Sequence, residues 1–191
     1  MMKFESVGTS IWSEKLLSRY LEGDSRRIVL EHSRLVATLA LDVAENLAIP
    51  AQDRLFIEEA ALLHDIGVCR VNAPKLGLHG EHPYILHGVL GRAILENEEY
   101  PLHALICERH IGVGLTTADI LKQSLPLPHR DMCPISLSEQ IICFADLFYS
   151  KNPAKLSQKK TVDQVRSNLL AFGEDKLQIF DTWLKKFKCS G

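Results

Sequence analysis

The sequence predicts an all-α fold, a single helical bundle that covers residues 1–191 as one domain. Apolar residues recur at three- and four-residue spacing along most of the chain, which is typical of amphipathic helices. We find no convincing alternating strand, internal repeat or low-complexity tract. The apolar fraction of 46% is enough for an ordinary globular core.

Two helices are expected at the N-terminal end. The first covers residues 13–21, and the second runs to about residue 47. Asp24 or Ser25 can cap the second helix. The apolar positions of this helix form one stripe, as expected for a face that packs on the core. His32 lies on that stripe, so its imidazole is expected to be buried.

The next segment combines a helix, a loop and a further helix. Pro50 suits the first turn of a helix that leads to residues 63–64, and Gly67 fits the position just past its end. Residues 68–80 contain proline and glycine without a period, so we expect a loop. Another helix is predicted over residues 82–97.

The C-terminal half predicts a series of shorter helices. Pro101 opens one that ends near residue 112, and Thr116 or Thr117 caps a short helix through residue 123. Three prolines make residues 124–135 an irregular connection. A capping box at Ser136 starts a helix running to about residue 150. Two amphipathic helices, over residues 162–172 and 175–187, close the chain.

Composition excludes several classes of function. The formal charge of −2 gives no extended basic face, so nucleic-acid binding is not favoured. Apolar runs are short, so no membrane span is expected, and the first ten residues lack an apolar signal core. We therefore expect a cytoplasmic protein. The five cysteines form no C-x-x-C pair, and Cys107 and Cys143 are expected to be small buried residues.

Six histidine and aspartate side chains interrupt apolar helical segments. A buried carboxylate or imidazole is costly unless a charge or hydrogen bonds compensate it. Converging helices would bring four imidazoles and two carboxylates together as mixed nitrogen and oxygen ligands, a common way to build a metal site in a bundle. The six are His32, His64, Asp65, His87, His110 and Asp146.

This ordered set resembles the HD-domain superfamily of metal-dependent phosphohydrolases. The tetrad "HDIG" starts at His64, and "HGVLGRAIL", "ERHIGVGLT" and "SLSEQIICFADLF" are similar to segments of the small HDIG subgroup. The likeness covers about residues 28–150 and leaves residues 151–191 as a C-terminal helical extension.

The resemblance implies two divalent transition-metal ions and a hydrolytic reaction. In the family a hydroxide between the metals attacks phosphorus, so Asp65 is the expected catalytic and bridging residue. Imidazole-rich ligation favours iron or manganese, with zinc, cobalt and nickel as alternatives. The expected metal ligands are, for the first ion, His32, His64, Asp65 and Asp146, and for the second His87 and His110.

The expected substrate is a nucleotide or another small phosphate ester. Many family members carry a phosphate-contacting lysine after the tetrad, but Val68 stands there in this chain. Basic or polar residues near the ligand segments could take its place. The substrate-binding candidates are Arg70, Lys75, His82, Arg109 and Lys151.

Several alternatives remain open at this stage. His82 lies five residues before His87, about 140° around a helix, so the two cannot readily bind one ion. Some HD-domain proteins with the same ligands are di-iron oxygenases that cleave C–C or C–P bonds, and a ligand sensor could keep the fold. Trp183, Phe180 and Phe187 suit either the core or a homodimer face.

Overall fold

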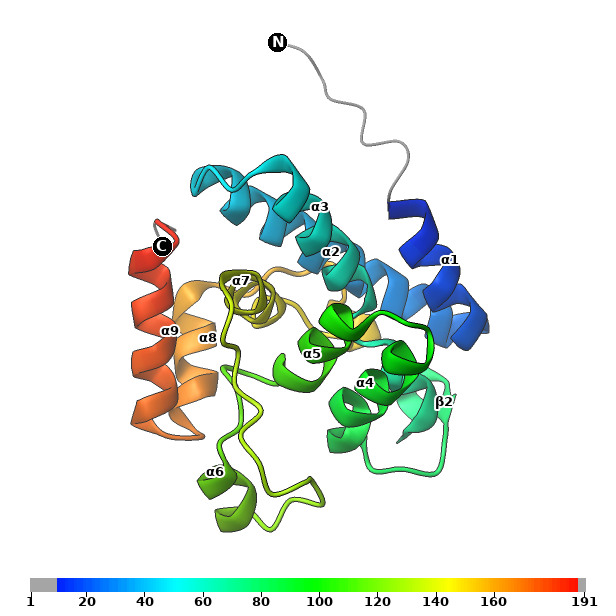
Figure 1. Ribbon diagram of the computed structural model, residues 1–191. Helices are drawn as coiled ribbons and strands as arrows, with labels where there is room; N and C mark the ends of the chain where they lie inside the picture. Colours follow the sequence, from blue (N-terminus) through cyan, green and yellow to red (C-terminus); the bar gives the residue numbers. More distant parts are fainter. Residues whose placement is uncertain (1–9, 189–191) are drawn as a thin grey trace.

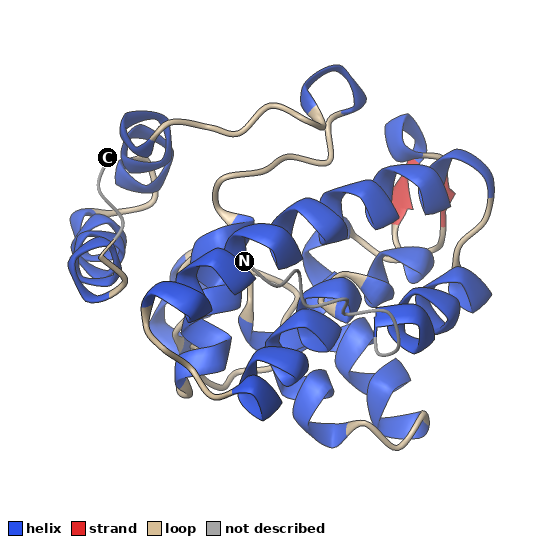
Figure 2. Cartoon of the chain, turned by 90° about the horizontal axis from the view of Figure 1, so that it is seen from above, coloured by secondary structure: helices blue, strands red, loops and turns tan. Residues whose placement is uncertain are grey.

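The computed structural model describes residues 10–188, which fold as a layered assembly of helices (Figures 1 and 2). The only sheet in this part of the chain is a two-stranded antiparallel hairpin, which pairs Asn72 with His79 and Ala73 with Leu78. The all-α prediction is therefore confirmed. The helices are α1 (Ser10–Tyr20), α2 (Gly23–Asn46), α3 (Ala51–Leu63), α4 (His87–Asn97), α5 (Pro101–Arg109), α6 (Thr117–Lys122), α7 (Leu137–Asp146), α8 (Val162–Leu170) and α9 (Glu174–Lys186). The shorter elements are η1 (Ile66–Arg70), β1 (Asn72–Ala73), η2 (Pro74–Leu76), β2 (Leu78–His79), η3 (Tyr84–Leu86) and η4 (Pro153–Lys155).

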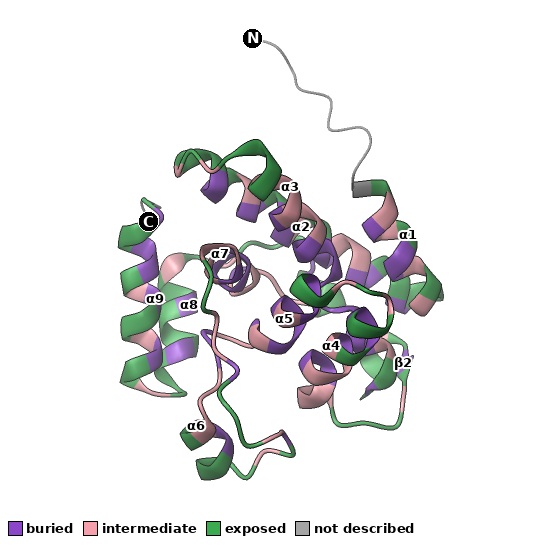
Figure 3. Ribbon diagram, viewed as in Figure 1, coloured by how far each residue is buried: buried purple, intermediate pink, exposed green. Residues whose placement is uncertain are grey.

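One apolar core joins α2, α3 and α7 to the C-terminal helices α8 and α9. Phe144 of α7 is fully buried, and its ring stacks on that of Phe180 with the centroids 5.6 Å apart. Phe187 packs edge-on against the same ring at 5.2 Å. The C-terminal aromatic residues thus lie in the core, which was one of their two predicted places. Figure 3 shows their helices lying against the central α7 with the buried sides inward.

A second apolar core joins α1, η1, α4, α5 and the start of α2. Val29 belongs to this second core, whereas Val36 belongs to the first. His32 lies between these two valines on the same buried face of α2 and is only 1% exposed. The long helix α2 therefore carries this imidazole across the junction between the two cores.

The structure corrects the predicted limits of several elements. The helix predicted from residue 82 begins at His87, because Pro83 is extended and the short helix η3 follows it. The helix predicted to reach residue 150 ends at Asp146, so that residue stands at the C-terminal end of α7. The predicted loop over residues 68–80 contains η1, η2 and the hairpin.

The helix caps were predicted with mixed success. The cap at Thr116, one of two predicted candidates, and the capping box at Ser136 are confirmed, and Thr116 forms a capping box as well. The prediction for α2 is wrong, because that helix follows an extended Glu22 and has no side-chain cap. The hydroxyl of Ser25 donates instead to the carbonyl of Glu22 at 2.7 Å.

The described residues also bear on the expectations from composition. Among residues 10–188 there is no helix long and apolar enough to cross a membrane. Cys107 and Cys143 are buried and unpaired, as expected. The expectation of a missing signal core concerns residues 1–9, which lie outside the described residues, as does Cys189. The division into a core and a C-terminal extension stays a prediction.

Candidate metal centre

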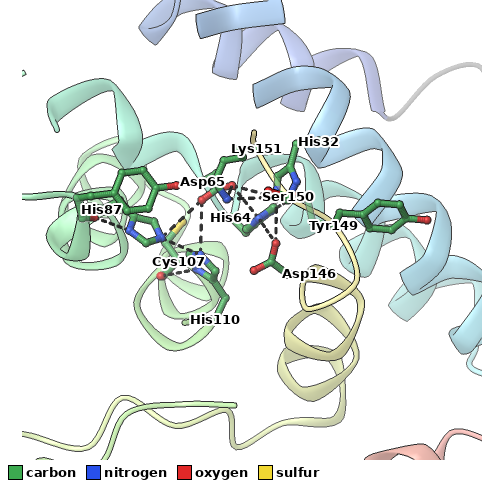
Figure 4. Close-up of polar contacts among 12 residues, drawn as sticks. His32, His64, Asp65, His87, Cys107, His110, Asp146, Tyr149, Ser150 and Lys151 are labelled. Carbon is green, nitrogen blue, oxygen red and sulfur yellow. Dashed lines mark hydrogen bonds and ion pairs between the residues drawn. The ribbon is translucent and has the colours of Figure 1, made fainter. Parts of the chain in front are cut away.

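The six predicted ligands converge at one place in the fold (Figure 4). His32 comes from the middle of α2, and the other five stand at or directly beyond helix ends. His64 and Asp65 follow α3, His87 is the first residue of α4, His110 follows α5 and Asp146 is the last residue of α7. Helix ends can bring short side chains together from several directions without making the helices themselves collide.

A close backbone approach brings α4 to Asp65. Gly67 lies in η1, where a Cβ atom would be 2.0 Å from the carbonyl oxygen of His87 and 2.3 Å from the nitrogen of Gly91. Any larger residue would push α4 away. The prediction that Gly67 ends a helix is therefore wrong, because this glycine makes room for a neighbouring helix, with no positive φ recorded for it. Gly88 acts similarly, since its Cβ would meet the carbonyl of Cys107 at 2.6 Å.

Three of the imidazoles are oriented by backbone carbonyls three residues earlier. The Nδ1 atoms of His64, His87 and His110 lie 2.6, 2.7 and 2.8 Å from the carbonyl oxygens of Ala61, Tyr84 and Cys107, respectively. A carbonyl only accepts, so each Nδ1 carries the hydrogen. The lone pair of each neutral ring is then on Nε2, the atom that faces the cluster.

Asp65 lies at the centre, and its two carboxylate oxygens face different partners. Oδ2 is 3.3 Å from Nε2 of His32 and 3.0 Å from Nε2 of His64. Oδ1 is 3.6 Å from Nε2 of both His87 and His110. Neither oxygen is exposed to solvent. The geometry divides the cluster into two halves that share this one carboxylate.

The acidic half consists of His32, His64 and Asp146. Oδ1 of Asp146 is 2.9 Å from Nε2 of His32 and 3.6 Å from Nε2 of His64. The ammonium group of Lys151 lies within this half, 2.5 Å from Oδ2 of Asp65 and 3.3 Å from Nε2 of His32. A lysine thus places a cation among the ligands.

The imidazole half consists of His87 and His110. Their Nε2 atoms are 3.1 Å apart. Both nitrogens bear lone pairs when the rings are neutral, so this approach is unfavourable without a cation or a proton between them. Of the described lysines and arginines, none forms a recorded ion pair or hydrogen bond with either imidazole.

The two halves differ in their proton affinity as well. Burial opposes a charge on His64, but Asp65 and Asp146 outweigh it and raise the pKa of His64 to about 10. Burial, together with the neighbouring His110, lowers the pKa of His87 to about 3. Burial also opposes the charge on Asp65, yet His64 and Lys151 hold the pKa of that carboxyl well below its usual range.

The donor set is compatible with divalent metal ions. Oδ2 of Asp65 is paired with Lys151, whereas the buried Oδ1 faces the imidazoles of His87 and His110 at 3.6 Å without a hydrogen bond among the described residues. A buried carboxylate oxygen in that position is costly unless a cation or a hydrogen bond satisfies it. Two groups have donor atoms within 4.8 Å of one another, namely His32 with His64 and Asp146, and His64 with Asp65 and His110. Neutral imidazole and carboxylate are ligands that suit transition metals.

The predicted substrate-binding residues lie in different environments. Lys151 is inside the cluster, as described above. Arg70, Lys75 and His82 are exposed and make no recorded side-chain contact with a cluster residue. Arg109 donates to the carboxylate of Glu139 at 2.9 Å, an ion pair with a neighbouring helix. The substrate-binding role of these residues stays a prediction.

The remaining histidines include one that is packed into the fold. His103 lies in the first turn of α5 and is buried. Its ring packs against Trp12, Phe56 and Tyr100, and Nε2 is 3.5 Å from the carboxylate of Glu59. Helix α1 covers the start of α5 through Trp12, which sequence periodicity alone does not reveal. His129, by contrast, is exposed in a loop.

Sequence reasoning missed the residues that support the cluster. Tyr84 interacts with Lys151 and Asp65, and its burial raises the pKa of its hydroxyl to about 12. Glu108 is buried two residues before His110 and accepts from both Arg92 and Arg130. Arg130 lies in the irregular connection, so this clamp ties that loop to α5. The signal available in the sequence was Glu108 itself, a charged residue inside an apolar helix.

A cavity of about 380 Å³ opens beside the acidic half. Asp146 and Lys151 line it together with residues from α8, the loop after α5 and the segment after α7. The cluster is therefore accessible from one side of the molecule, and Asp146 has a side chain that is 18% exposed.

Comparisons with known proteins point to one family. The model of the family described as "HD domain" matches residues 29–150. The chain is 38% identical over 123 residues to an uncharacterized protein of Methanocaldococcus jannaschii, which is 62% of this chain and 64% of that protein. It is 32% identical over 120 residues to a tRNA (cytidine(56)-2'-O)-methyltransferase of Picrophilus torridus and 30% identical over 164 residues to that of Thermoplasma volcanium.

The alignments with the two methyltransferases cover 62% and 85% of this chain, but only 30% and 42% of the methyltransferases themselves. The chain thus spans less than two thirds of the length of each of these relatives. Among solved structures, the HD domain of the phosphodiesterase PgpH from L. monocytogenes has a TM-score of 0.52 at 16% identity. The superposition covers 91% of this chain and 83% of the other, which shows a shared fold.

Proposed function

Because this chain belongs to the HD-domain family, we propose that it is a metal-dependent phosphohydrolase acting on a small phosphate ester. The observation that carries the proposal is the division of the two Asp65 oxygens between separate ligand groups. A carboxylate in that position can bridge two cations. The match of residues 29–150 to the family model supports the same class of chemistry.

Two divalent cations, when bound, would lower the pKa of a water molecule and neutralise phosphoryl oxygens. The acidic half and the imidazole half would each hold one of them, with Asp65 shared. Carbonyl contacts at Nδ1 keep three imidazoles in the tautomer that ligates through Nε2. We favour iron or manganese because four of the six donors are imidazoles.

Lys151 would act on the substrate in this proposal. Its ammonium lies at the boundary between the acidic half and the cavity, and its side chain is 14% exposed. Burial opposes the charge on Lys151, but Asp65 outweighs it and raises the pKa above its ordinary value, so the ammonium stays charged. A cation there can hold a phosphoryl oxygen once a metal takes over the charge of Asp65.

The proposal is tested by metal analysis followed by a substrate panel. The purified chain, expressed with added iron or manganese, should contain bound metal and release phosphate from small esters. His110→Ala should lose the ion of the imidazole half and the activity, whereas His129→Ala, in an exposed loop, should keep both. Phosphate release should be the same with and without oxygen. Oxygen-dependent turnover with reduced iron and no phosphate release would instead support a di-iron oxygenase, and a chain that takes up no metal would contradict both enzymes.

A further inference from the structure

The cavity beside the acidic half has a charged inner end and mainly apolar walls. Asp146 and Lys151 form its inner end, so a molecule in the cavity reaches the ligand cluster directly. The walls are mainly aliphatic and come from η3, the loop after α5 and α8. The aliphatic wall residues include Ile85, Ile111, Val113, Leu115, Val165 and Leu169.

The charged groups along these walls are already engaged. Lys160 donates to the carbonyls of Leu147 and Tyr149 at 2.8 and 3.1 Å. Lys176 pairs with Asp119 at 2.5 Å. Neither ammonium is therefore fully available to a ligand. Among the described wall residues, Lys151 is the cation placed to meet an anionic group together with bound metal.

Three uncharged polar side chains line the cavity. Gln123 and Asn168 are exposed, and Tyr149 points away from the ligand cluster (Figure 4). A ligand with hydroxyl groups along its length would lose hydration against the aliphatic walls without gaining partners there, which is unfavourable. Sugar phosphates are poorly matched to such a surface.

An exposed aromatic residue extends the apolar wall outward. Phe172 follows α8, lines the cavity and is 68% exposed. A ring this exposed contributes little by burial in the free protein. A ligand that covered it would remove apolar surface from water.

We propose that the substrate is a phosphate monoester whose organic part is apolar, an alkyl or aryl group, with the phosphate at Lys151 and the metals. This inference rests on the proposed function for the identity of the anionic group. The apolar group would lie along the aliphatic walls toward Phe172. Water would cleave the ester and yield inorganic phosphate and the corresponding alcohol, which conserves all atoms without an oxidant.

Binding is measured first, because it does not depend on hydrolysis. Calorimetry on the manganese-loaded chain, under anaerobic conditions, compares octylphosphonate with methylphosphonate, neither of which has an ester bond to hydrolyse. Each buried methylene is worth up to about fourfold in affinity, so octylphosphonate should bind at least about thirtyfold tighter. Equal affinities, or tighter binding of adenosine monophosphate than of octylphosphonate, would overturn the inference.

Variants place the apolar group in the cavity. Phe172→Ala should weaken octylphosphonate about fivefold to tenfold and leave methylphosphonate unchanged, and Phe172→Leu should restore part of the loss. Leu102→Ala is the matched control, because Leu102 is 64% exposed on α5 and does not line the cavity. An equal effect of both alanine variants would contradict binding along this wall.

Hydrolysis separates this inference from the proposed function. Octyl phosphate should be cleaved with a higher kcat/KM than methyl phosphate. Equal kcat/KM values for the two esters would overturn the apolar substrate and leave the phosphohydrolase standing. Tight, Phe172-dependent binding of octylphosphonate with no phosphate release from any ester would keep the apolar ligand and reject the phosphohydrolase.

Discussion

The acidic half and the imidazole half of the cluster are built from similar side chains but differ in charge. The acidic half adds the carboxylate of Asp146 to its imidazoles, and the ammonium of Lys151 lies among them. The imidazole half has no carboxylate of its own, and the Nε2 atoms of His87 and His110 face each other at 3.1 Å. Within residues 10–188, the shared Asp65 is the one negative charge that pairs with imidazoles of both halves.

This difference bears on how strongly each half would hold a metal ion. In the acidic half, a lysine supplies positive charge that a metal would otherwise provide. In the imidazole half no described lysine or arginine takes that role. Burial, together with the neighbouring His110, lowers the pKa of His87 to about 3, so its ring is neutral. We therefore expect the acidic half to hold its ion more tightly, because it offers an additional anionic ligand.

The largest effect is expected from removing the residue that both halves share. Asp65→Ala should reduce metal content to background and lower kcat/KM by at least about 10⁴-fold, since each half loses an anionic ligand. Helical circular dichroism should be largely retained at 20 °C because the two apolar cores are untouched. Elemental analysis and phosphate release measure the outcome. A variant that kept one full ion per chain would show that the two halves do not depend on Asp65.

The next prediction compares the halves directly. Asp146→Ala should weaken the tighter ion by more than about a hundredfold, because losing a ligand exceeds the 10–100-fold typical of losing an outer hydrogen-bond partner. His87→Ala should reduce only the occupancy of the weaker ion. Titration with manganese, followed by calorimetry, gives the two affinities. Equal losses in both variants would contradict the proposed difference between the halves.

The sequence predicted the six residues that converge in the cluster better than it predicted the residues around them. The histidines and aspartates were recognisable because polar side chains are costly within apolar helical segments, and an ordered family pattern linked them. Lys151, by contrast, was only one of five basic or polar residues predicted as candidates for substrate binding. The chain after Asp146 returns Lys151 to the cluster because α7 ends four residues earlier than predicted, and helix ends are poorly determined by periodicity.

Tertiary packing explains why the structural roles of Gly67 and His103 could not be read from the sequence pattern. Gly67 was expected to end a helix, whereas the close approach of α4 is what requires a glycine there. His103 is covered by Trp12, a residue more than 90 positions away in sequence, and local pattern carries no information about that contact. The metal-ligand role of the six residues stays a prediction until metal content is measured.

A third prediction concerns the cation in the acidic half. Lys151→Met should destabilise the metal-free protein by about 2 to 3 kcal/mol, because it leaves the buried carboxylate of Asp65 without its ammonium partner. The same variant should bind manganese about tenfold more tightly, since no ammonium must be displaced. Thermal unfolding in EDTA and in manganese should give a wider separation of Tm values than in the parent chain. Lys155→Met, at an exposed position, is the control and should change neither value.

The smallest effect is expected at a partly exposed ion pair outside both halves. Burial opposes the charge on Asp119, but hydrogen bonds from Lys176 and Thr116 lower the pKa of Asp119 to about 2, from an ordinary value of 3.8. The folded state thus binds fewer protons than the unfolded state between these values. The pair therefore stabilises the protein above about pH 4, and this contribution is lost as the pH falls toward 2.

Asp119→Asn should accordingly lower the free energy of unfolding of the metal-free protein by about 1 kcal/mol at pH 5, a value reduced for solvent screening. The difference from the parent chain should shrink to near zero by pH 2. Urea unfolding at several pH values in EDTA measures it, with Asp42→Asn at an exposed site as the control. Because Asp119 lies outside both halves, the manganese affinities should not change. A loss of manganese binding in Asp119→Asn would show that the cluster depends on the segment around α6. The difference in metal affinity between the two halves would then not be explained by the charges of their own residues alone.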